Sequence, residues 1–358
     1  MKNERILAIN PGSTSTKIAV YEGAKNIFLK TLRHSTEELK DFEKITDQFQ
    51  FRKNIIMQEL ENAGIALNTI KVIVGRGGLV KPIPSGVYEV NDRLLEDLKI
   101  GIMGEHASNL GGLIAYDMAM ALDNARAFIA DPVVVDELQD VARVAGHPLF
   151  ERASIFHALN QKAVARSYAK SLNRRYEDLN LIVAHLGGGI SVGAHRQGKV
   201  VDVNNALDGE GPFSPERSGT LPVGSLAKLC FSGKYTLDEI KKMITGKGGY
   251  VAYLNTNSAY DVELNANAGD PKARLIQDAM AYQVAKEIGA MAAVLKGSID
   301  GIILTGGIAH NGYLVNYIRE MIGHMGAIIV YPGEDEMEAL AMNGLMVQRG
   351  ETVPLVYA

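Results

Sequence analysis

The residues best suited to chemistry begin in a polar loop close to the N-terminus. Two short apolar runs, residues 6–9 and 18–21, predict paired strands, and the polar stretch between them predicts their turn. Glycine lets a ligand approach the backbone closely, and hydroxyl and ammonium groups donate to anions. The polar residues of this turn are Asn10, Gly12, Ser13, Ser15 and Lys17. They are typical of a phosphate-binding loop, although a plain hairpin with a Ser/Thr-rich turn has the same pattern.

Two further glycine clusters follow predicted strands. Gly187, Gly188 and Gly189 lie between two strands and form a second candidate phosphate loop. Gly306 and Gly307 lie between a strand and a helix, where backbone N–H groups can meet a nucleotide. Each cluster alone is ordinary turn chemistry, but three in one chain favour nucleotide binding. The first loop is not a Walker A loop, because the G-x-x-x-x-G-K-[ST] pattern is absent and a strand follows it.

Two arginines stand among small and polar neighbours. Arg76 is flanked by glycines, and Arg217 precedes Ser218 and Gly219. The guanidinium fork matches carboxylate and phosphoryl oxygens, so the pair could neutralise charge on a transferring phosphoryl group. The alternative for either residue is a surface arginine in a flexible loop.

A carboxylate and several histidines are weaker candidates. Asp131 ends a predicted strand, which is a common turn position and also a common place for a metal-orienting carboxylate. His157 and Asn160 are predicted to share a helix face, but a helical histidine is more often a packed or capping residue. The same alternative applies to His106 and His185. The chain has eight histidines without an H-E-x-x-H pattern and one cysteine, so a structural zinc site is not expected.

The elements that must position these residues alternate between strand and helix. Apolar runs predict strands at residues 72–74, 127–130, 181–184, 190–194 and 302–304. Helical spacing predicts helices at residues 37–62, 110–122, 155–172, 279–295 and 336–347. The prolines within residues 209–224 predict an irregular loop around Arg217. This alternation indicates an α/β protein.

Segments in the two halves of the chain are similar to each other in sequence. Gly12, Ala19 and Gly23 match Gly187, Ala194 and Gly198 at one fixed offset. A second echo pairs residues 70–78 with residues 299–307 at a different offset, so the second copy would hold an insertion. These echoes predict two like α/β domains that present glycine loops to a shared cleft.

Length and composition agree with this organisation. The 358 residues favour two domains, and a formal charge of −4 gives no case for nucleic-acid or anionic-membrane partners. No apolar run approaches the ~20 residues needed to span a bilayer, and the N-terminal apolar run is too short for a signal peptide. Cys230 is the single cysteine, which excludes an intramolecular disulfide, and its apolar neighbours predict a core position. We therefore expect a cytoplasmic protein.

Taken together, these segments resemble the acetokinase family of acetate and butyrate kinases, within the actin-like superfamily. The matching stretches follow the same order along nearly the whole chain: residues 10–17, 75–78, His106, Asp131, residues 155–157, 185–189, 216–219, 304–311 and 333–336. The resemblance implies two ribonuclease H-like (actin-like ATPase) domains around a central nucleotide and substrate cleft. We expect residues 1–153 with 334–358 in one lobe and residues 154–333 in the other, which would carry most of the nucleotide site.

The resemblance also implies an activity and a role for each candidate. The reaction is reversible transfer of the ATP γ-phosphoryl group to a short-chain carboxylate, giving an acyl phosphate and ADP, with Mg²⁺. The implied metal residues are Asn10, Asp131 and Glu336; the catalytic residues are Arg76, Arg217, His157 and Asp131. The implied nucleotide residues are Ser13, Ser15, Lys17, His185, Gly187, Gly188, Gly189, Gly306, Gly307 and Asn311. The implied substrate residues are Arg76, Gly77, Gly78, His106 and Phe156. The family often forms dimers, so a homo-oligomer is expected, without a nucleic-acid or membrane partner.

Departures from the acetate kinase pattern point to the butyrate kinase branch of the family. They are Pro11 and Thr14 in the hairpin, Gly188 in place of asparagine, and Ala309-His310 before Asn311. Acetate kinases follow the first arginine with β-branched residues, whereas Gly77 and Gly78 are expected to leave room for more carbons. Because each buried methylene contributes ~0.8 kcal/mol, selectivity among acids should be graded. Butyrate is the expected substrate, with isobutyrate and acetate as alternatives.

Two rival functions remain open at this point. A sugar kinase of the same superfamily would need a carboxylate base near an alcohol. An actin- or chaperone-like ATPase would act through nucleotide-gated partner binding and would show slow ATPase activity without a carboxylate. The arginine pair and the ordered motifs weigh against both.

Overall fold

The computed structural model describes residues 4–358. The chain forms two compact units. Unit 1 comprises the chain up to Val135 together with Asp335–Ala358, and unit 2 comprises Asp136–Glu334. Residues 136–153, which the sequence placed with the first lobe, therefore belong to unit 2. The reason is local bonding: the Gln139 N–H donates to Val201 O, and Arg152 donates to Asp202 and to Val203 O.

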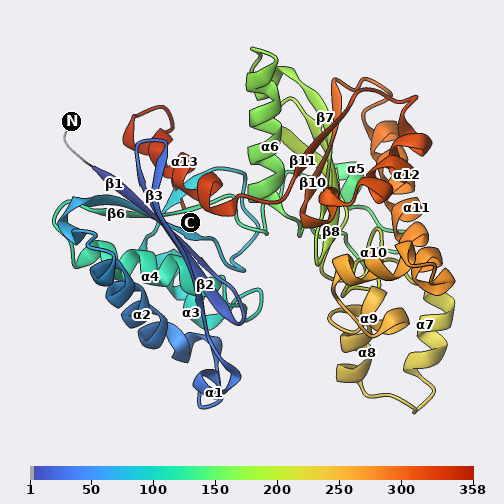
Figure 1. Cartoon of the computed structure of the whole chain (residues 1–358), viewed down its shortest axis with the longest axis horizontal. Coiled ribbons are helices and arrows are strands. Elements are labelled where there is room, and N and C mark those ends of the chain that lie inside the picture. Colours follow the sequence, from blue (N-terminus) through green and yellow to red (C-terminus); the bar gives the residue numbers. More distant parts are fainter. Residues whose placement is uncertain (1–3) are drawn as a thin grey trace. The chain divides into compact units, whose positions relative to one another are not determined.

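Unit 1 is a mixed sheet with helices on both faces (Figure 1). Its strands are β1 Arg5–Pro11, β2 Ser15–Glu22, β3 Lys25–Arg33, β4 Ile70–Arg76, β5 Val87–Glu89, β6 Arg126–Ala130 and β12 Leu355–Val356. Its helices are α1 Thr36–Leu39, α2 Phe49–Asn62, α3 Asp92–Ile100, α4 Asn109–Met120 and α13 Glu336–Gln348. Short 3-10 helices cover Ile45–Gln48 and Leu67–Thr69. The strand order is β12-β5-β6-β4-β1-β2-β3.

Alternation along the central strands explains why both faces of this sheet are covered. Leu7 and Ile73 belong to the buried cluster formed with helices α2, α3 and α4. Their neighbours point to the opposite face, because successive side chains of a strand alternate. There Ile6 and Val74 lie against Gly344 of α13, where an added Cβ would come within 2.7 Å of Val74 Cγ2. Figure 1 shows α13 on the face opposite α2 and α4.

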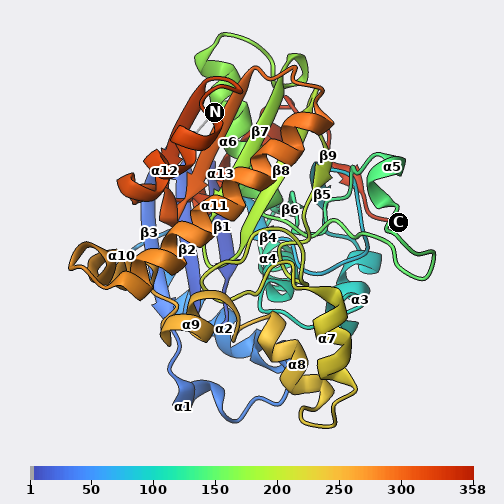
Figure 2. The same cartoon turned by 90° about the vertical axis from the view of Figure 1, so that its right-hand side faces the viewer.

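Unit 2 repeats this plan with a smaller sheet in the order β11-β10-β7-β8-β9. Its strands are β7 Asn180–Leu186, β8 Ile190–Arg196, β9 Lys199–Val203, β10 Gly301–Gly306 and β11 Ile328–Pro332. Its helices are α5 Asp140–Arg143, α6 Ala158–Ser171, α7 Val223–Cys230, α8 Leu237–Ile244, α9 Gly249–Leu254, α10 Ala259–Asn267, α11 Pro271–Val294 and α12 Gly312–Ile322. Short 3-10 helices cover Tyr176–Asp178 and Gly307–His310. Figure 2 shows α11 lying across β7 and β8.

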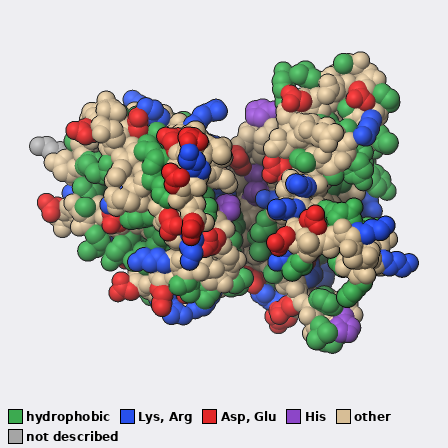
Figure 3. Space-filling model, turned by 90° about the horizontal axis from the view of Figure 1, so that it is seen from below, with side chains coloured by type: hydrophobic (Ala, Val, Ile, Leu, Met, Phe, Trp, Pro, Cys, Tyr) green, Lys and Arg blue, Asp and Glu red, His purple; other side chains and the backbone are tan. Residues whose placement is uncertain are grey.

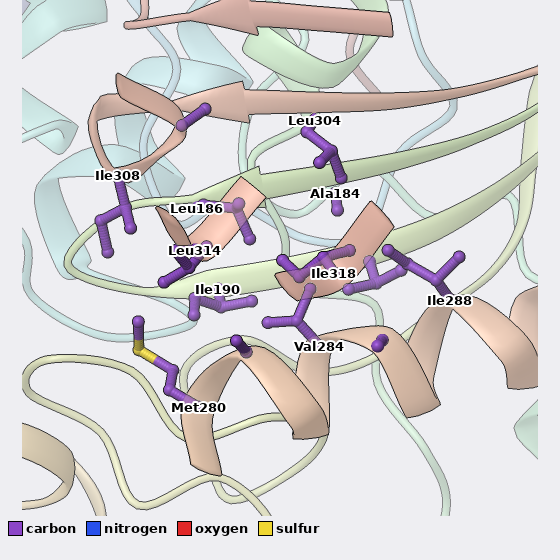
Figure 4. Close-up of a cluster of buried hydrophobic side chains, with 14 of the residues drawn as sticks. Ala184, Leu186, Ile190, Met280, Val284, Ile288, Leu304, Ile308, Leu314 and Ile318 are labelled. Carbon is purple, nitrogen blue, oxygen red and sulfur yellow. The ribbon is translucent and has the colours of Figure 1, made fainter. Parts of the chain in front are cut away.

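The core of unit 2 forms between this sheet and the pair α11 and α12. Ala184 and Leu304 of neighbouring strands face Val284 and Ile288 of α11, with Ile318 of α12 alongside (Figure 4). The other face of the sheet packs against α6 in a separate cluster. Burial on both faces explains why these strands are continuously apolar.

The two sheets share a common five-strand pattern. In unit 1, β3-β2-β1-β4-β6 has β1 antiparallel to β2 and parallel to β4, and β4 parallel to β6. In unit 2, β9-β8-β7-β10-β11 has the same sequence of directions. The prediction of two similar α/β domains is therefore confirmed.

Two local predictions were wrong. The helix expected over residues 37–62 is interrupted after α1, because Phe42 turns back to contact the Phe51 ring at 5.6 Å between centroids. A continuous helix would separate these residues by about 13 Å along its axis. Cys230 is exposed instead of buried, since α7 places no side chain in the core.

The surface is mixed in charge. Acidic and basic side chains are interspersed on the face shown in Figure 3. No helix within residues 4–358 has both the length and the apolar character needed to cross a lipid bilayer.

Candidate active site

The N-terminal hairpin forms as predicted, with its polar loop between β1 and β2. Asn10 lies directly opposite Lys17 in the antiparallel register, so both side chains project from the same face. The Gly12 N–H donates to Ser15 O at 2.7 Å and closes the turn. Ser13 is exposed, whereas Asn10 is buried. The loop therefore presents hydroxyl and ammonium donors to solvent.

A buried arginine that the sequence analysis missed holds this loop from behind. Arg52 of α2 is 0% exposed, and all three of its side-chain nitrogens donate hydrogen bonds. Their acceptors are Gly12 O at 2.8 Å, Ser13 O, Ser15 O and Thr16 Oγ1 at 3.0 Å each, and Gln48 Oε1. Burial lowers the pKa of Arg52 to about 10. In the sequence, this role could have been inferred only from the helical spacing, which places Arg52 on the face of α2 that packs on the sheet.

Arg76, Asn10 and Glu336 form one cluster in unit 1. Arg76 Nη2 lies 3.1 Å from Glu336 Oε1, and its Nη1 donates to Glu336 Oε2 at 3.2 Å and to Asn10 Oδ1 at 3.3 Å. Asn10 Nδ2 also donates to Glu336 Oε2. Glu336 is fixed at the start of α13, which Asp335 caps by accepting from the Glu338 N–H at 2.8 Å. Three of the predicted site residues are thus in direct contact.

The glycines around Arg76 serve close packing. A Cβ on Gly75 would lie 2.1 Å from Gly111 O, so β4 and α4 meet backbone to backbone. A Cβ on Gly77 would lie 2.6 Å from Pro132 Cβ, and one on Gly78 would lie 2.4 Å from Asn109 Oδ1. The expectation that Gly77 and Gly78 leave room for extra substrate carbons was wrong, because that space is already filled by unit 1 itself.

Asp131 directly follows β6 and has a strained backbone conformation. Its φ of 38° is in the left-handed region, and it is 2% exposed. Its Oδ1 accepts from Ser85 Oγ at 2.6 Å and from the Gly86 N–H at 2.9 Å. Such strain, fixed by hydrogen bonds, is frequent at functional sites. His106, in the same unit, is exposed on the loop before α4, and its Nδ1 accepts from the Ser108 N–H.

In unit 2, Arg217 lies directly on the second glycine loop. A Cβ on Gly189 would come within 2.1 Å of Arg217 Nη1, so a side chain there would displace the guanidinium. Ser214 joins the two segments: its Oγ donates to Gly188 O at 2.6 Å and accepts from the Arg217 N–H at 3.2 Å. Arg217 Nη1 also donates to Ala206 O, and burial lowers the pKa of the guanidinium. Ser214 is a second residue that the sequence analysis missed.

Two histidines stack in the same unit. The rings of His157 and His185 are 3.8 Å apart at an angle of 13°. His157 caps α6 instead of lying within it, so it does not share a helix face with Asn160 as predicted. Asn160 instead contacts His185, with Oδ1 2.8 Å from Nδ1, and His185 Nε2 lies 3.4 Å from Glu334 Oε2. Phe156, next to His157, is 2% exposed.

The third glycine cluster follows β10. Gly306 has a φ of 90°, and a Cβ there would meet Leu186 O at 2.3 Å. Gly307 has open space around the same position and starts a 3-10 turn that precedes α12. Asn311 caps α12 by accepting from the Leu314 N–H at 2.9 Å. Glycine is thus required at 306 by the backbone, and Asn311 has a structural role of its own.

The predicted residues therefore fall into local groups, each within one unit. Unit 1 joins the hairpin loop to the cluster of Arg76, Asn10 and Glu336, and unit 2 joins the second glycine loop to Arg217 and stacks the two histidines. These groups combine glycine loops, carboxylates and arginines, which suits phosphoryl transfer.

Comparison with known proteins identifies the family. A model of the acetokinase family matches residues 148–343. The chain belongs to the acetokinase family.

Similarity to named relatives extends over almost the whole chain. It is 58% identical over 347 residues to butyrate kinase 2 of Clostridium acetobutylicum, covering 97% of both chains. It is also 58% identical to butyrate kinase 1 of that organism, covering 97% of this chain and 98% of the relative. Among solved structures, the acetate kinase of Porphyromonas gingivalis superposes with a TM-score of 0.80 at 18% identity, covering 96% of this chain and all of that one. This last likeness establishes the shared fold of the family.

Proposed function

We propose that the protein is a butyrate kinase, which transfers the ATP γ-phosphoryl group reversibly to butanoate and forms butanoyl phosphate and ADP. The observation that carries this proposal is 58% identity, over 97% of the chain, to two enzymes that bear that name. The bonded hairpin loop and the half-buried arginines Arg76 and Arg217 support it independently.

The chemistry needs no general base. A carboxylate is already ionised at neutral pH, so it can attack the γ-phosphorus directly in line with the leaving ADP oxygen. Arg76 binds the carboxylate, and Arg217 and His157 donate to the oxygens of the transferring phosphoryl group. These side chains hold their positions through Glu336, Ala206 O and Ser191 respectively. Catalysis then rests on orientation and charge stabilisation.

The donors of unit 1 fit a magnesium ion. Asp131 and Glu336 offer carboxylate oxygens and Asn10 an amide oxygen, which are the hard donors that Mg²⁺ prefers. Within residues 4–358, no three His, Cys, Asp or Glu side chains gather closely enough to hold a metal by themselves. Mg²⁺ is commonly held by one or two carboxylates together with substrate phosphates and water, so these residues would supply only part of its ligands. When bound, Mg²⁺ would supply charge neutralisation at the phosphates.

The nucleotide is assigned to the glycine loops. Ser13, Ser15 and Lys17 donate from the hairpin, and backbone N–H groups of residues 187–189 donate from the second loop. Gly306, Gly307 and Asn311 are assigned to adenosine, and His185 supports the second loop through its contact with Gly187, where a Cβ would lie 2.9 Å from His185 Nε2. His106 and Phe156 are retained as candidate substrate contacts, whereas Gly77 and Gly78 act through packing.

Acyl phosphate formation tests the proposal. The enzyme is incubated with ATP, Mg²⁺ and each of formate, acetate, propionate, butyrate, isobutyrate and valerate, and the product is trapped with hydroxylamine. A maximum of kcat/KM at butyrate supports the proposal, and a maximum at isobutyrate or acetate keeps a carboxylate kinase with a different preference. ATP hydrolysis without acyl phosphate from any acid would replace it with the actin- or chaperone-like ATPase.

We also infer that the protein works in the cytoplasm as a homo-oligomer. A single cysteine suits a reducing compartment, and ATP is the phosphoryl donor. Sedimentation velocity of the purified chain tests the oligomer, since a monomer has a mass of 38.7 kDa.

A further inference from the structure

A chain of buried polar side chains runs away from His157 into unit 2. His157 Nδ1 lies 2.9 Å from Ser191 Oγ, and Ser191 Oγ lies 2.8 Å from Gln161 Nε2. Gln161 Oε1 lies 2.9 Å from His195 Nε2, and His195 Nδ1 lies 2.7 Å from the Tyr176 hydroxyl. Ser191, Gln161 and His195 are each 0% exposed.

The backbone fixes the direction of these hydrogen bonds. Gln161 Nε2 also lies 3.0 Å from Ser191 O, which is a carbonyl and can only accept. The amide nitrogen of Gln161 must therefore face Ser191, and its oxygen must face His195. His195 then donates from Nε2, and its Nδ1 accepts from Tyr176. Burial holds the pKa of His195 well below its usual value, so one ring proton is the stable state.

The same hydrogen-bond argument determines which ring nitrogen of His157 is protonated. Ser191 Oγ already accepts from Gln161 Nε2, and the His157 backbone N–H also points to it at 3.4 Å. The Ser191 hydroxyl proton thus needs an acceptor, and Nδ1 of His157 supplies one. If Nδ1 carried a proton, Ser191 Oγ would face only donors and its own proton would lose a partner.

The sheet makes room for this chain at one glycine. A Cβ on Gly193 of β8 would lie 2.7 Å from Gln161 Oε1 and 3.3 Å from His195 Nε2. A side chain there would require Gln161 and His195 to shift from these positions. The contact is thus built into the strand as well as into α6.

We propose that Ser191, Gln161 and His195 are positioning residues that keep Nδ1 of His157 unprotonated and place its single ring proton on Nε2. This rests on the proposed function for its meaning: His157 donates to the phosphoryl oxygens as a neutral imidazole and transfers no proton. A second proton would enter at Nδ1 and displace the Ser191 hydroxyl. The ring of His185, which stacks on His157, has its Nε2 3.4 Å from Glu334 Oε2.

Nitrogen NMR of the whole enzyme tests the tautomer directly. Long-range ¹⁵N–¹H spectra of enzyme labelled with ¹⁵N-histidine separate protonated from unprotonated ring nitrogens, and a His157→Gln sample assigns the signals. Spectra are recorded near pH 8, above the ordinary histidine pKa of about 6.5. The expected wild-type result is an Nε2-protonated His157, and an Nδ1-protonated or doubly protonated ring would overturn the proposal without any variant.

A serine variant links the tautomer to turnover. Ser191→Ala should give His157 a mixture of both tautomers and lower kcat about fivefold, the equivalent of one ordinary hydrogen bond, with little change in KM. Ser171→Ala is the control, because Ser171 Oγ donates within α6, to Tyr168 O at 2.7 Å. An unchanged His157 spectrum in Ser191→Ala refutes the proposal that these hydrogen bonds set the tautomer of His157. If the wild-type enzyme forms no acyl phosphate, the proposed function is refuted instead. The wild-type spectrum still determines the tautomer in that case.

Discussion

Replacing Arg52 by methionine should destabilise the hairpin loop, although Arg52 itself is fully buried behind it. Methionine keeps most of the aliphatic volume but removes every donor. The carbonyls of Gly12, Ser13 and Ser15 then lose the guanidinium that joins them from behind, at 2.8 to 3.0 Å. No carboxylate within residues 4–358 forms an ion pair with Arg52. Its charge is therefore stabilised only by neutral oxygens.

The magnitude follows from burial. Each buried acceptor left without a partner costs about 1–3 kcal/mol. Ser13 is exposed and Gly12 and Ser15 are half-buried, so water replaces part of the loss. Removing a buried charge also relieves desolvation, which offsets part of it further. We expect a net loss of about 2–4 kcal/mol, or a decrease in Tm of roughly 5–15 °C for a unit of this size.

The assay compares three variants by calorimetry and by acyl phosphate kinetics. Arg52→Met should lower kcat/KM for ATP by about 10- to 100-fold, because misplaced loop donors no longer bind phosphate in register. Arg52→Lys keeps the charge but not the fork, so its values should be intermediate. Arg126→Met is the matched control: Arg126 forms a half-exposed pair with Glu89, and its loss should cost about 1 kcal/mol or less. A folded Arg52→Met with the ATP kinetics of wild type refutes the reasoning.

Three further predictions concern different parts of the chain. Arg217→Ala should lower kcat by about 10³-fold or more with a folded protein by circular dichroism, and near-normal turnover would remove its assigned role. Burial, then the nearby Arg52, lowers the pKa of His34 to about 4. Between pH 4 and 6.5 the unfolded chain therefore binds more protons than the folded chain, so the free energy of unfolding decreases as the pH is lowered. Relative to its value at pH 7.5, wild-type stability at pH 5 should fall about 2 kcal/mol more than that of His34→Gln, and parallel denaturant curves would contradict this. Gly77→Ala should lower Tm through its clash with Pro132 and leave the preference among acids unchanged, whereas a shift toward shorter acids would restore Gly77 as a pocket wall.

The strands and the hairpin loop could be predicted because their signals are local. Apolar runs placed β1, β4, β7 and β10, and the repeated glycine spacing indicated two similar sheets. The contact of Arg76 with Glu336 could not be derived from spacing, since the two residues are far apart in sequence and meet only after α13 packs on the sheet. The family resemblance supplied both residues, but not their contact.

The errors at Gly77, Gly78 and Arg52 each have a physical cause. A glycine in a sequence shows that a side chain is missing, but not what occupies the space. Gly77 and Gly78 were interpreted as open volume, whereas Pro132 and Asn109 fill it. Arg52 was overlooked for the opposite reason: a charged residue within a helix is usually solvated, and only tertiary structure shows that this one is fully buried.

The backbone carbonyls of the two hairpin loops accept hydrogen bonds from different side chains. A loop that offers its N–H groups to an anion must turn carbonyls back into the protein, where each needs a donor. In unit 1 the Gly12 N–H donates to Ser15 O, and Arg52 of α2 donates to the carbonyls of Gly12, Ser13 and Ser15. In unit 2 the equivalent Gly187 N–H bonds Gly189 O at 3.1 Å, and Ser214 donates to Gly188 O.

The two loops also differ in how the arginine beside them is used in the proposed mechanism. Arg52 is fully buried behind its loop and spends its donors on carbonyls, so it can only position. In unit 2 a serine hydroxyl satisfies the loop, which leaves the guanidinium of Arg217 to lie against Gly189 with Ala206 O as its bonded carbonyl. Ser214→Ala should therefore affect both features together: Gly188 O loses its donor and Arg217 loses the anchor of its backbone N–H. We expect kcat and KM for ATP to change together in this variant, and a change in KM alone would show that the serine supports the loop but not Arg217.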